Sequence, residues 1–243
     1  MRRRNSSSVV RILTVVALIL LFVTGLLFAL RPTVIDRQRM KSEDLLIQMI
    51  EQGETEIVDL HLPEMEGEAY EYEPESILDG METFTESQEE EPAVFEGEPI
   101  VVKGYAVITI PSIDLKMAVT RGVGHKALRC GAGWLPDSAE IGDAGNCVIL
   151  GHRMKTYGRH FNRLDELETG DEIGLTLADG RSFRYTVTGK EVLLPQDVSN
   201  ALASHTDGFK LTLVTCTPTG VGSHRLLVYC DKNGYPKPRR EWV

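Results

Sequence analysis

Two apolar runs decide the fold of this chain, Leu211-Thr-Leu-Val-Thr-Cys-Thr-Pro218 and Arg225-Leu-Leu-Val-Tyr229. The segment between them holds a proline and two glycines, which are turn residues, so the pattern predicts a β-hairpin. The first strand ends in the thiol of Cys216, and the second begins with the guanidinium of Arg225. Such a hairpin would hold a nucleophile and a fixed cation side by side.

A third reactive group follows another predicted strand. The apolar run Val148-Ile-Leu150 ends in Gly151-His152-Arg153. A thiol, an imidazole and a guanidinium, each at a strand end, are the groups needed for acyl transfer through a thioester. A thiol with a pKa of about 8.5 is only about 3% thiolate at pH 7, and a nearby cation or imidazolium raises that fraction. The pattern therefore favours Cys216 as nucleophile and His152 as its partner.

Strand alternation predicts which way each side chain of the hairpin points, because successive residues face opposite sides of a sheet. One face of the first strand carries Leu211, Leu213 and Thr215, and the other, more polar face carries Cys216. Cys216 is therefore expected to lean away from the core, towards a surface or groove. In the second strand Cys230 falls with the interior set, and Arg225 is free to share the groove of Cys216.

The five other histidines are weaker partners for the thiol. His61 lies in an acidic segment, and His224 would alternate to the side away from Arg225. Polar loop residues surround the remaining three, so we expect them to be solvated: His125, His160 and His205.

Short apolar runs separated by turn residues fill the chain from about residue 101. They predict strands at residues 106–110, 115–119, 147–150, 172–177, 182–187, 190–194, 210–215 and 225–229. Helical patterning is limited to a turn or two near Leu128 and around residues 161–167. Seven or eight short strands in about 140 residues indicate a small β-barrel or sandwich with a core that needs no metal.

The N-terminus carries a membrane signal. Residues 12–30 contain no charged side chain, and at 1.5 Å per residue they span roughly 28 Å, about the thickness of the hydrocarbon layer. Arginines at positions 2, 3, 4 and 11 precede this stretch and predict a cytoplasmic tail at residues 1–11, with the rest outside. A cleaved signal peptide is the competing interpretation, but the stretch is long for one and its end is a poor cleavage site.

The negative charge is concentrated in one segment. Residues 51–100 hold eighteen acids and no Lys or Arg, whereas residues 101–243 hold fifteen acids and eighteen bases. We therefore expect an acidic extracellular linker at residues 31–98, serving as a spacer or, alternatively, as a lid, and a catalytic domain at residues 99–243. Within the linker, residues 38–52 could form a juxtamembrane helix, with Ser42 as its cap.

The four cysteines are Cys130, Cys147, Cys216 and Cys230. An even number outside the membrane suggests disulfides, but a catalytic Cys216 must be free. Cys147 and Cys230 have apolar neighbours and suit buried thiols, while a pairing among the three non-catalytic cysteines stays open. There is no CxxC, no zinc-like spacing and no nucleotide or nucleic-acid motif, so the sequence predicts no metal and no cofactor.

Residues 105–232 resemble the catalytic domain of the sortases, the cysteine transpeptidases of Gram-positive cell surfaces. The motifs that carry the resemblance are Tyr105-Ala-Val-Ile-Thr-Ile-Pro-Ser-Ile113, Gly131-Ala-Gly-Trp-Leu-Pro136, Val148-Ile-Leu-Gly-His-Arg153, Phe161-Asn-Arg-Leu-Asp-Glu-Leu167, Thr212-Leu-Val-Thr-Cys-Thr-Pro218 and His224-Arg-Leu-Leu-Val228. The resemblance implies a mostly-β fold, a closed barrel of seven to eight strands with short helices, here preceded by one N-terminal transmembrane helix.

The resemblance also implies a role for each matching residue. Cys216 would attack the Thr carbonyl of an LPxTG-like sorting signal, and His152 would protonate the leaving amine and later deprotonate the incoming one. Arg225 would hold the substrate and stabilise the oxyanion, and Thr215 would help to orient the substrate. Residues 194–208 match the variable loop that walls the sorting-signal pocket, which makes Leu194 and Pro195 substrate-binding candidates.

The implied partners are surface proteins or pilins with a C-terminal sorting signal, and an amine acceptor from peptidoglycan precursors or a pilin lysine. The motif wording is most similar to the pilin-polymerising class C. However, the linker lacks that class's Asp-Pro-aromatic lid signature and no second apolar segment follows Tyr229, so a class D-like enzyme is the alternative. Two other hypotheses remain, a thiol protease that uses water and a non-catalytic peptide-binding module.

Overall fold

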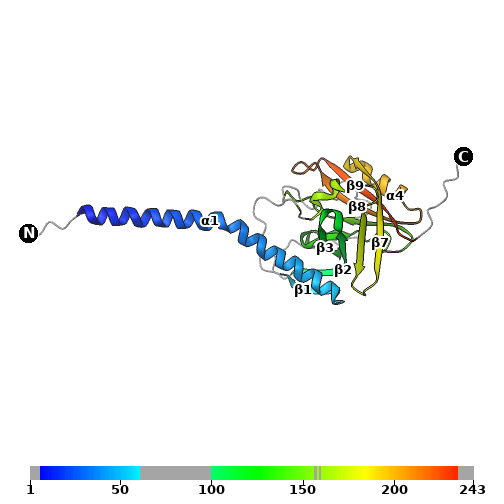
Figure 1. Ribbon diagram of the computed structural model, residues 1–243, viewed down its shortest axis with the longest axis horizontal. Coiled ribbons are helices and arrows are strands. Elements are labelled where there is room, and N and C mark those ends of the chain that lie inside the picture. Colours follow the sequence, from blue (N-terminus) through cyan, green and yellow to red (C-terminus); the bar gives the residue numbers. More distant parts are fainter. Residues whose placement is uncertain (1–5, 61–99, 156–157, 159, 235–243) are drawn as a thin grey trace, which may run out of the picture. The chain divides into compact units, whose positions relative to one another are not determined.

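The computed structural model describes residues 6–60, 100–155, 158 and 160–234 (Figure 1). The chain falls into two compact units, Met1–Lys41 and Ser42–Val243. Helix α1 (Ser6–Glu51) begins in the first unit and ends in the second. No helix within the described residues is long and apolar enough to cross a bilayer. The signal anchor at residues 12–30 stays a prediction.

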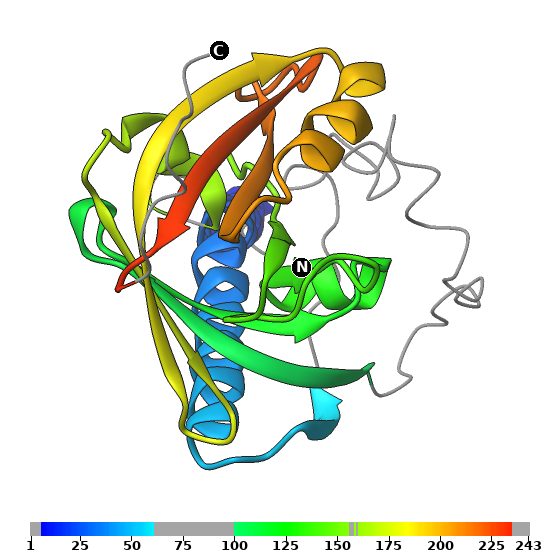
Figure 2. The same ribbon diagram turned by 90° about the vertical axis from the view of Figure 1, so that its right-hand side faces the viewer.

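Eight strands close a barrel, which confirms the predicted mostly-β class, and a ninth lies at its edge (Figure 2). The sheet order is β1-β2-β3-β4-β5-β8-β9-β7-β6, and β6 pairs back to β2. The strands are β1 (Glu56–Leu60), β2 (Ile100–Ile110), β3 (Leu115–Arg121), β4 (Ala132–Trp134), β5 (Gly145–Leu150), β6 (Glu172–Leu177), β7 (Ser182–Leu193), β8 (Phe209–Thr217) and β9 (His224–Lys232).

Short helices connect the strands of the barrel. They are η2 (Pro111–Ile113), α3 (His125–Cys130), η3 (Phe161–Glu166), η4 (Pro195–Asp197) and α4 (Val198–Ser204). The helical turns expected near Leu128 and around residues 161–167 correspond to α3 and η3. The strands expected at 182–187 and 190–194 are one strand, β7, because a register shift between Val187 and Gly189 lets it continue through the irregular region.

Two apolar layers lie on the two faces of the sheet. The interior of the barrel holds the larger cluster, to which β8 contributes Leu211 and Leu213. The outer face of the same strands holds a second cluster, which contains Val214 and Cys216 from β8. The alternation along β8 is therefore the one that a period of two predicts, with Cys216 pointing away from the barrel interior.

Helix α4 covers this outer cluster. Its Val198 and Leu202 pack there with Leu227 of β9, and Figure 2 shows the helix beside β8 and β9. Leu128 of α3 belongs to the same cluster. The outer face of β8 and β9 is thus a covered apolar surface and not an open one.

The compact unit begins at Ser42, earlier than the predicted domain boundary at residue 99. The last turns of α1 bury Leu46, Ile47 and Ile50 in a cluster with side chains from β2, β3 and α3. Gly104 of β2 makes room for this packing, since a Cβ there would lie 2.7 Å from Cγ1 of Ile50. Strand β1 then pairs with β2. Residues 42–60 are therefore part of the folded unit and not of a solvated linker, and Ser42 lies within α1 and does not begin a new helix.

Leu46→Ala should lower the free energy of unfolding by about 3 kcal/mol, roughly 5–12 °C in Tm, because it removes a fully buried side chain. Leu45→Ala is the matched control, since the neighbouring side chain is 48% exposed and should cost less than about 1 kcal/mol. Thermal unfolding of the full-length chain in detergent measures both. Equal losses in the two variants would contradict the packing of α1 on the barrel.

Candidate active site

Strands β8 and β9 bring Cys216 and Arg225 together. The two residues are direct partners in the antiparallel ladder, so their side chains share one face with Cβ atoms about 4.5–5.5 Å apart. Both side chains are buried, with 6% exposure for Cys216 and 1% for Arg225. The predicted hairpin therefore places the thiol beside the guanidinium.

The parallel pairing of β5 with β8 places His152 next to Cys216. Leu150 pairs with Val214, and the amide of Gly151 continues the ladder to the carbonyl of Val214 at 3.1 Å. Beyond this pair, the hydroxyl of Thr215 donates to the carbonyl of Gly151 and Nη1 of Arg153 donates to the hydroxyl oxygen of Thr217, so His152 and Cys216 lie between these two contacts. The three sequence-predicted groups therefore gather at one end of the neighbouring strands β5, β8 and β9.

The turn between β8 and β9 orients the guanidinium of Arg225. Its Nη1 donates to the carbonyl oxygens of Gly222, at 2.8 Å, and of His224, at 3.1 Å. Gly220 and Gly222 have φ values of +79° and +62°, a conformation that favours glycine. The Nε of Arg225 is buried and meets no acceptor among the residues that the structure describes.

Cys216 leans away from the barrel interior, as expected, but it is only 6% exposed. The segment between β7 and β8 folds into η4 and α4 and covers it with apolar side chains. Alternation along one strand predicts the face of a residue, whereas the cover comes from another part of the chain.

The four cysteines form no disulfide, and all are buried. Burial raises the pKa of Cys130 to about 12. Burial likewise raises the pKa values of Cys147 and Cys230 well above the ordinary range. These three thiols stay protonated at neutral pH and are poor nucleophiles, so Cys216 is the remaining candidate.

Of the other histidines that the structure describes, His160 departs from the expectation that it is solvated. His160 is only 6% exposed, and its Nε2 lies 3.3 Å from Oε1 of Glu43. This contact joins His160 to the end of α1. His205 is partly buried and stacks on Tyr229 with 4.0 Å between ring centroids. His224 pairs with Thr217, one residue from the Cys216 pair and so on the other face. The side chain of His125 and all of His61 fall outside the described residues.

Of the three predicted substrate-binding residues, Thr215 is buried, whereas Leu194 and Pro195 lie in the segment after β7. Thr215 faces the barrel interior opposite Leu226, and its hydroxyl donates to the carbonyl of Gly151 at 2.7 Å. Leu194 is 43% exposed and precedes η4, which begins at Pro195. The sequence analysis does not single out Leu193, the ladder partner of Arg225, which packs against the outer cluster.

Arg153 is a further residue that the analysis of motifs does not assign to any role. Its side chain is 8% exposed and links Thr217, next to Cys216, with Asp165 of η3. The sequence feature that could have identified Arg153 is its position directly after His152. An arginine in a polar loop is more often solvated, so the pattern alone did not reveal these contacts.

Gly151→Ala should lower kcat by about 10²-fold, because a Cβ at this position would lie 2.6 Å from the ring of Phe161 and would displace His152. Gly189→Ala in β7 is the matched control, since its Cβ would meet nothing within 4 Å and its rate should stay near that of the parent. Steady-state turnover of a sorting peptide measures both variants. A parental rate for Gly151→Ala would show that the segment relaxes without moving the imidazole.

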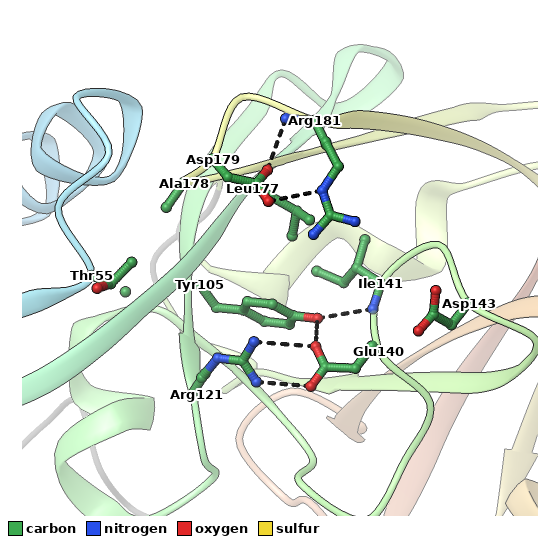
Figure 3. A pocket seen from close by; sticks show the side chains of 11 residues that line it. Thr55, Tyr105, Arg121, Glu140, Ile141, Asp143, Leu177, Ala178, Asp179 and Arg181 are labelled. Atoms are coloured by element: carbon green, nitrogen blue, oxygen red, sulfur yellow. Dashed lines mark hydrogen bonds and ion pairs between the residues drawn. The ribbon is translucent and has the colours of Figure 1, made fainter.

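A second feature is a pocket of about 280 Å³, lined mainly by residues of β2, β3, β6 and the loop before β5, and none of the three sequence-predicted groups lines it (Figure 3). Its polar groups bind one another: the Arg121 guanidinium stacks 4.0 Å from the Tyr105 ring and donates to both carboxylate oxygens of Glu140. The Tyr105 hydroxyl donates to Glu140 and accepts from the amide of Ile141. This network ties β2 and β3 to the loop before β5 and supplies no nucleophile.

Comparisons with known proteins point to one family. A family model described as a sortase domain matches residues 108–233, more than half of the 243-residue chain. Sortase A of Bacillus anthracis is 31% identical over 52% of this chain and 59% of that protein. Sortase D of Bacillus subtilis is 29% identical over 54% of this chain and 65% of that protein. The matches thus span less than two thirds of either relative.

One solved structure is similar over most of its length. It is Sortase A from Corynebacterium diphtheriae, with a TM-score of 0.50 and 26% sequence identity, covering 86% of this chain and 88% of that one. The likeness therefore extends beyond the residues that the family model matches.

Proposed function

The chain belongs to the sortase family, and we propose that it is a membrane-anchored cysteine transpeptidase. It would cleave an LPxTG-like sorting signal through a thioester on Cys216 and transfer the acyl group to an amine. The observation that carries the proposal is the convergence of Cys216, His152 and Arg225 at one end of β5, β8 and β9. A nucleophile, a proton carrier and a fixed donor within one site are the requirements of this chemistry.

The proposed reaction proceeds in two acyl transfers. The Cys216 thiolate attacks the carbonyl carbon of the signal's Thr, and the carbonyl oxygen becomes an oxyanion. His152 donates a proton to the nitrogen of the departing amine as the C–N bond breaks, which leaves a thioester. The incoming amine then attacks the thioester and gives its proton to His152, while the C–S bond breaks and the thiolate is restored.

Arg225 is suited to stabilise the oxyanion. Its guanidinium is already held by two carbonyl oxygens and needs no reorganisation when negative charge develops. A preorganised donor of this kind contributes about 3 to 4 kcal/mol to lowering the barrier. The buried Nε–H is the donor that the substrate oxygen would reach.

The cover over Cys216 supports transfer to an amine over hydrolysis. Cys216 belongs to the buried cluster that includes apolar side chains of α4 and β9, and it is only 6% exposed. A site that excludes water lengthens the life of a thioester and lets a bound amine compete for it. A thiol protease would need a water molecule in the same place.

The sorting signal would bind beside the segment that forms η4 and α4. Leu194 and Pro195 begin this segment, and Leu193 before them is the ladder partner of Arg225. We place the signal's apolar residues against Leu194 and its scissile bond over Cys216. The signal would come from surface proteins or pilins, and the amine from a peptidoglycan precursor or a pilin lysine.

The membrane anchor is the second part of the proposal. Helix α1 includes all of residues 12–30, and the large apolar side chains from Leu13 to Val23 are 42% to 73% exposed. Such a surface suits lipid, and the arginines before residue 12 suit the cytoplasmic side. The catalytic unit would then lie outside the cell, where its substrates are presented.

An assay with the full-length chain in detergent tests the function. The protein is incubated with LPxTG-type peptides, with and without a peptidoglycan-like amine or a lysine-containing pilin peptide, and products are identified by mass spectrometry. We expect a peptide adduct on Cys216 and a peptide–amine conjugate whose yield rises with amine concentration. Cleavage at the same rate with no amine incorporated would make the protein a hydrolase, and the preferred amine would distinguish wall anchoring from pilin assembly.

A further inference from the structure

Each neighbour of Cys216 is bonded to a neighbour of His152. On one side, the hydroxyl of Thr215 donates to the carbonyl oxygen of Gly151 at 2.7 Å. On the other side, Nη1 of Arg153 donates to the hydroxyl oxygen of Thr217 at 2.7 Å. The thiol and the imidazole therefore lie between two hydrogen bonds that join their strands directly. These two contacts continue the pairing of β5 with β8 as far as His152 and Cys216.

The second arm of Arg153 reaches a different element. Its Nη2 lies 2.7 Å from Oδ1 of Asp165, and the guanidinium side chain is 8% exposed. Asp165 belongs to η3, the helix that opens with Phe161, whose amide donates to the carbonyl of His152 at 3.1 Å. Arg153 thus connects the end of β8 to the helix that also holds the backbone of His152.

We propose that Arg153 is a positioning residue, which sets the separation between the sulfur of Cys216 and the ring of His152 by clamping Thr217 to Asp165. The proposal rests on the function proposed above. Arg153 itself bonds to protein atoms and carries no step of the reaction. Its role is to keep the two reacting groups within proton-transfer reach while the substrate enters and the amide leaves.

The two contacts require an arginine. A planar guanidinium offers separate nitrogens in a fixed fork, so it holds a hydroxyl and a carboxylate at the same time. A lysine ammonium is a single point on a flexible stem and would not span both acceptors with fixed geometry. Arg153→Lys therefore keeps the charge and removes the clamp.

The test is a set of variants of the full-length protein. We expect Arg153→Lys to lower kcat for the sorting peptide by about 10-fold to 10²-fold with KM nearly unchanged. The pH profile of kcat/KM should also change, because the separation of sulfur and ring determines how strongly each affects the other's proton. Thr217→Val and Asp165→Asn should each reproduce part of the loss, and neither should add its full effect to Arg153→Lys. Guanidinium ion should partly restore Arg153→Ala.

The control is Arg163→Lys, an arginine of the same η3 helix that binds Glu166 and the carbonyl of Ile113 away from the site. We expect it to keep the parental rate and pH profile, and thermal unfolding identifies any variant that fails to fold. A folded Arg153→Lys or Thr217→Val with parental kcat and pH profile would overturn the positioning role. Absence of any peptide adduct in the parent protein would instead refute the proposed function, so the two failures are distinguishable.

Discussion

Cys216→Ala should abolish turnover of a sorting peptide, with a loss of at least about 10⁴-fold and no covalent adduct. The methyl group of alanine cannot form a thioester. His152 can then protonate no leaving amine, and no oxyanion forms for Arg225 to stabilise. The fold should persist, because alanine fits the apolar cluster on the outer face of β8. Intact-protein mass spectrometry after incubation with peptide measures the adduct, and thermal unfolding measures the fold.

Cys230→Ala is the matched control for this experiment. Cys230 lies in β9, one strand from Cys216, but it belongs to the barrel interior and burial raises its pKa far above neutral pH. Its removal should cost some stability and leave the adduct at full yield. If the adduct still forms in Cys216→Ala, or is lost in Cys230→Ala, then Cys216 is not the nucleophile and the assignment made here is wrong.

The face on which Cys216 lies was predictable because the period of a β-strand is two. Leu211 and Leu213 fall in the barrel interior, as the alternation requires, and the ladder pairs Cys216 with Arg225. The hairpin is local, and its turn residues stand in the sequence beside the strands. Patterns of this kind depend on neighbours along the chain and so can be seen without the structure.

Contacts between distant parts of the chain were not predictable in the same way. Residues 42–60 adjoin an acidic segment, yet Leu46 and Ile50 pack on residues of β2 and β3. The Glu43 contact that helps to bury His160 spans 117 positions. Composition describes a segment alone, whereas burial depends on what the fold places against it. The sequence also did not predict strand β4, because three residues are too few to show an alternating pattern.

Arg153 shows the same limit within the site. Its partner Thr217 lies 64 positions away, and only the pairing of β5 with β8 brings the two together. A sequence motif identifies the residues that react, whereas the structure is needed to identify the residues that position them. The orientation of the Arg225 guanidinium, held by carbonyl oxygens of the turn, is likewise a property of the folded hairpin and not of its sequence.

Arg225→Lys should lower kcat/KM for the sorting peptide by about 10²-fold to 10³-fold, although the positive charge is kept. The guanidinium uses Nη1 to hold the carbonyl oxygens of Gly222 and His224 and leaves Nε–H for the substrate. An ammonium carries its three N–H donors on one nitrogen at the end of a flexible stem, so it cannot hold the turn and the oxyanion in the same fixed geometry. Arg184→Lys, an exposed change in β7, should leave the rate unchanged.

The substitution separates geometry from charge at the oxyanion. Formation of the adduct on Cys216 can be followed at early times by mass spectrometry, and thermal unfolding reports whether the buried lysine is tolerated. If acylation slows while the fold survives, the fixed direction of the Nε–H donor is what lowers the barrier. If a folded Arg225→Lys acylates at the parental rate, positive charge alone is sufficient, and the donor geometry proposed for Arg225 is wrong. Because Arg225 is 1% exposed, solvent cannot supply a substitute donor, and the loss should not be recovered by raising the peptide concentration.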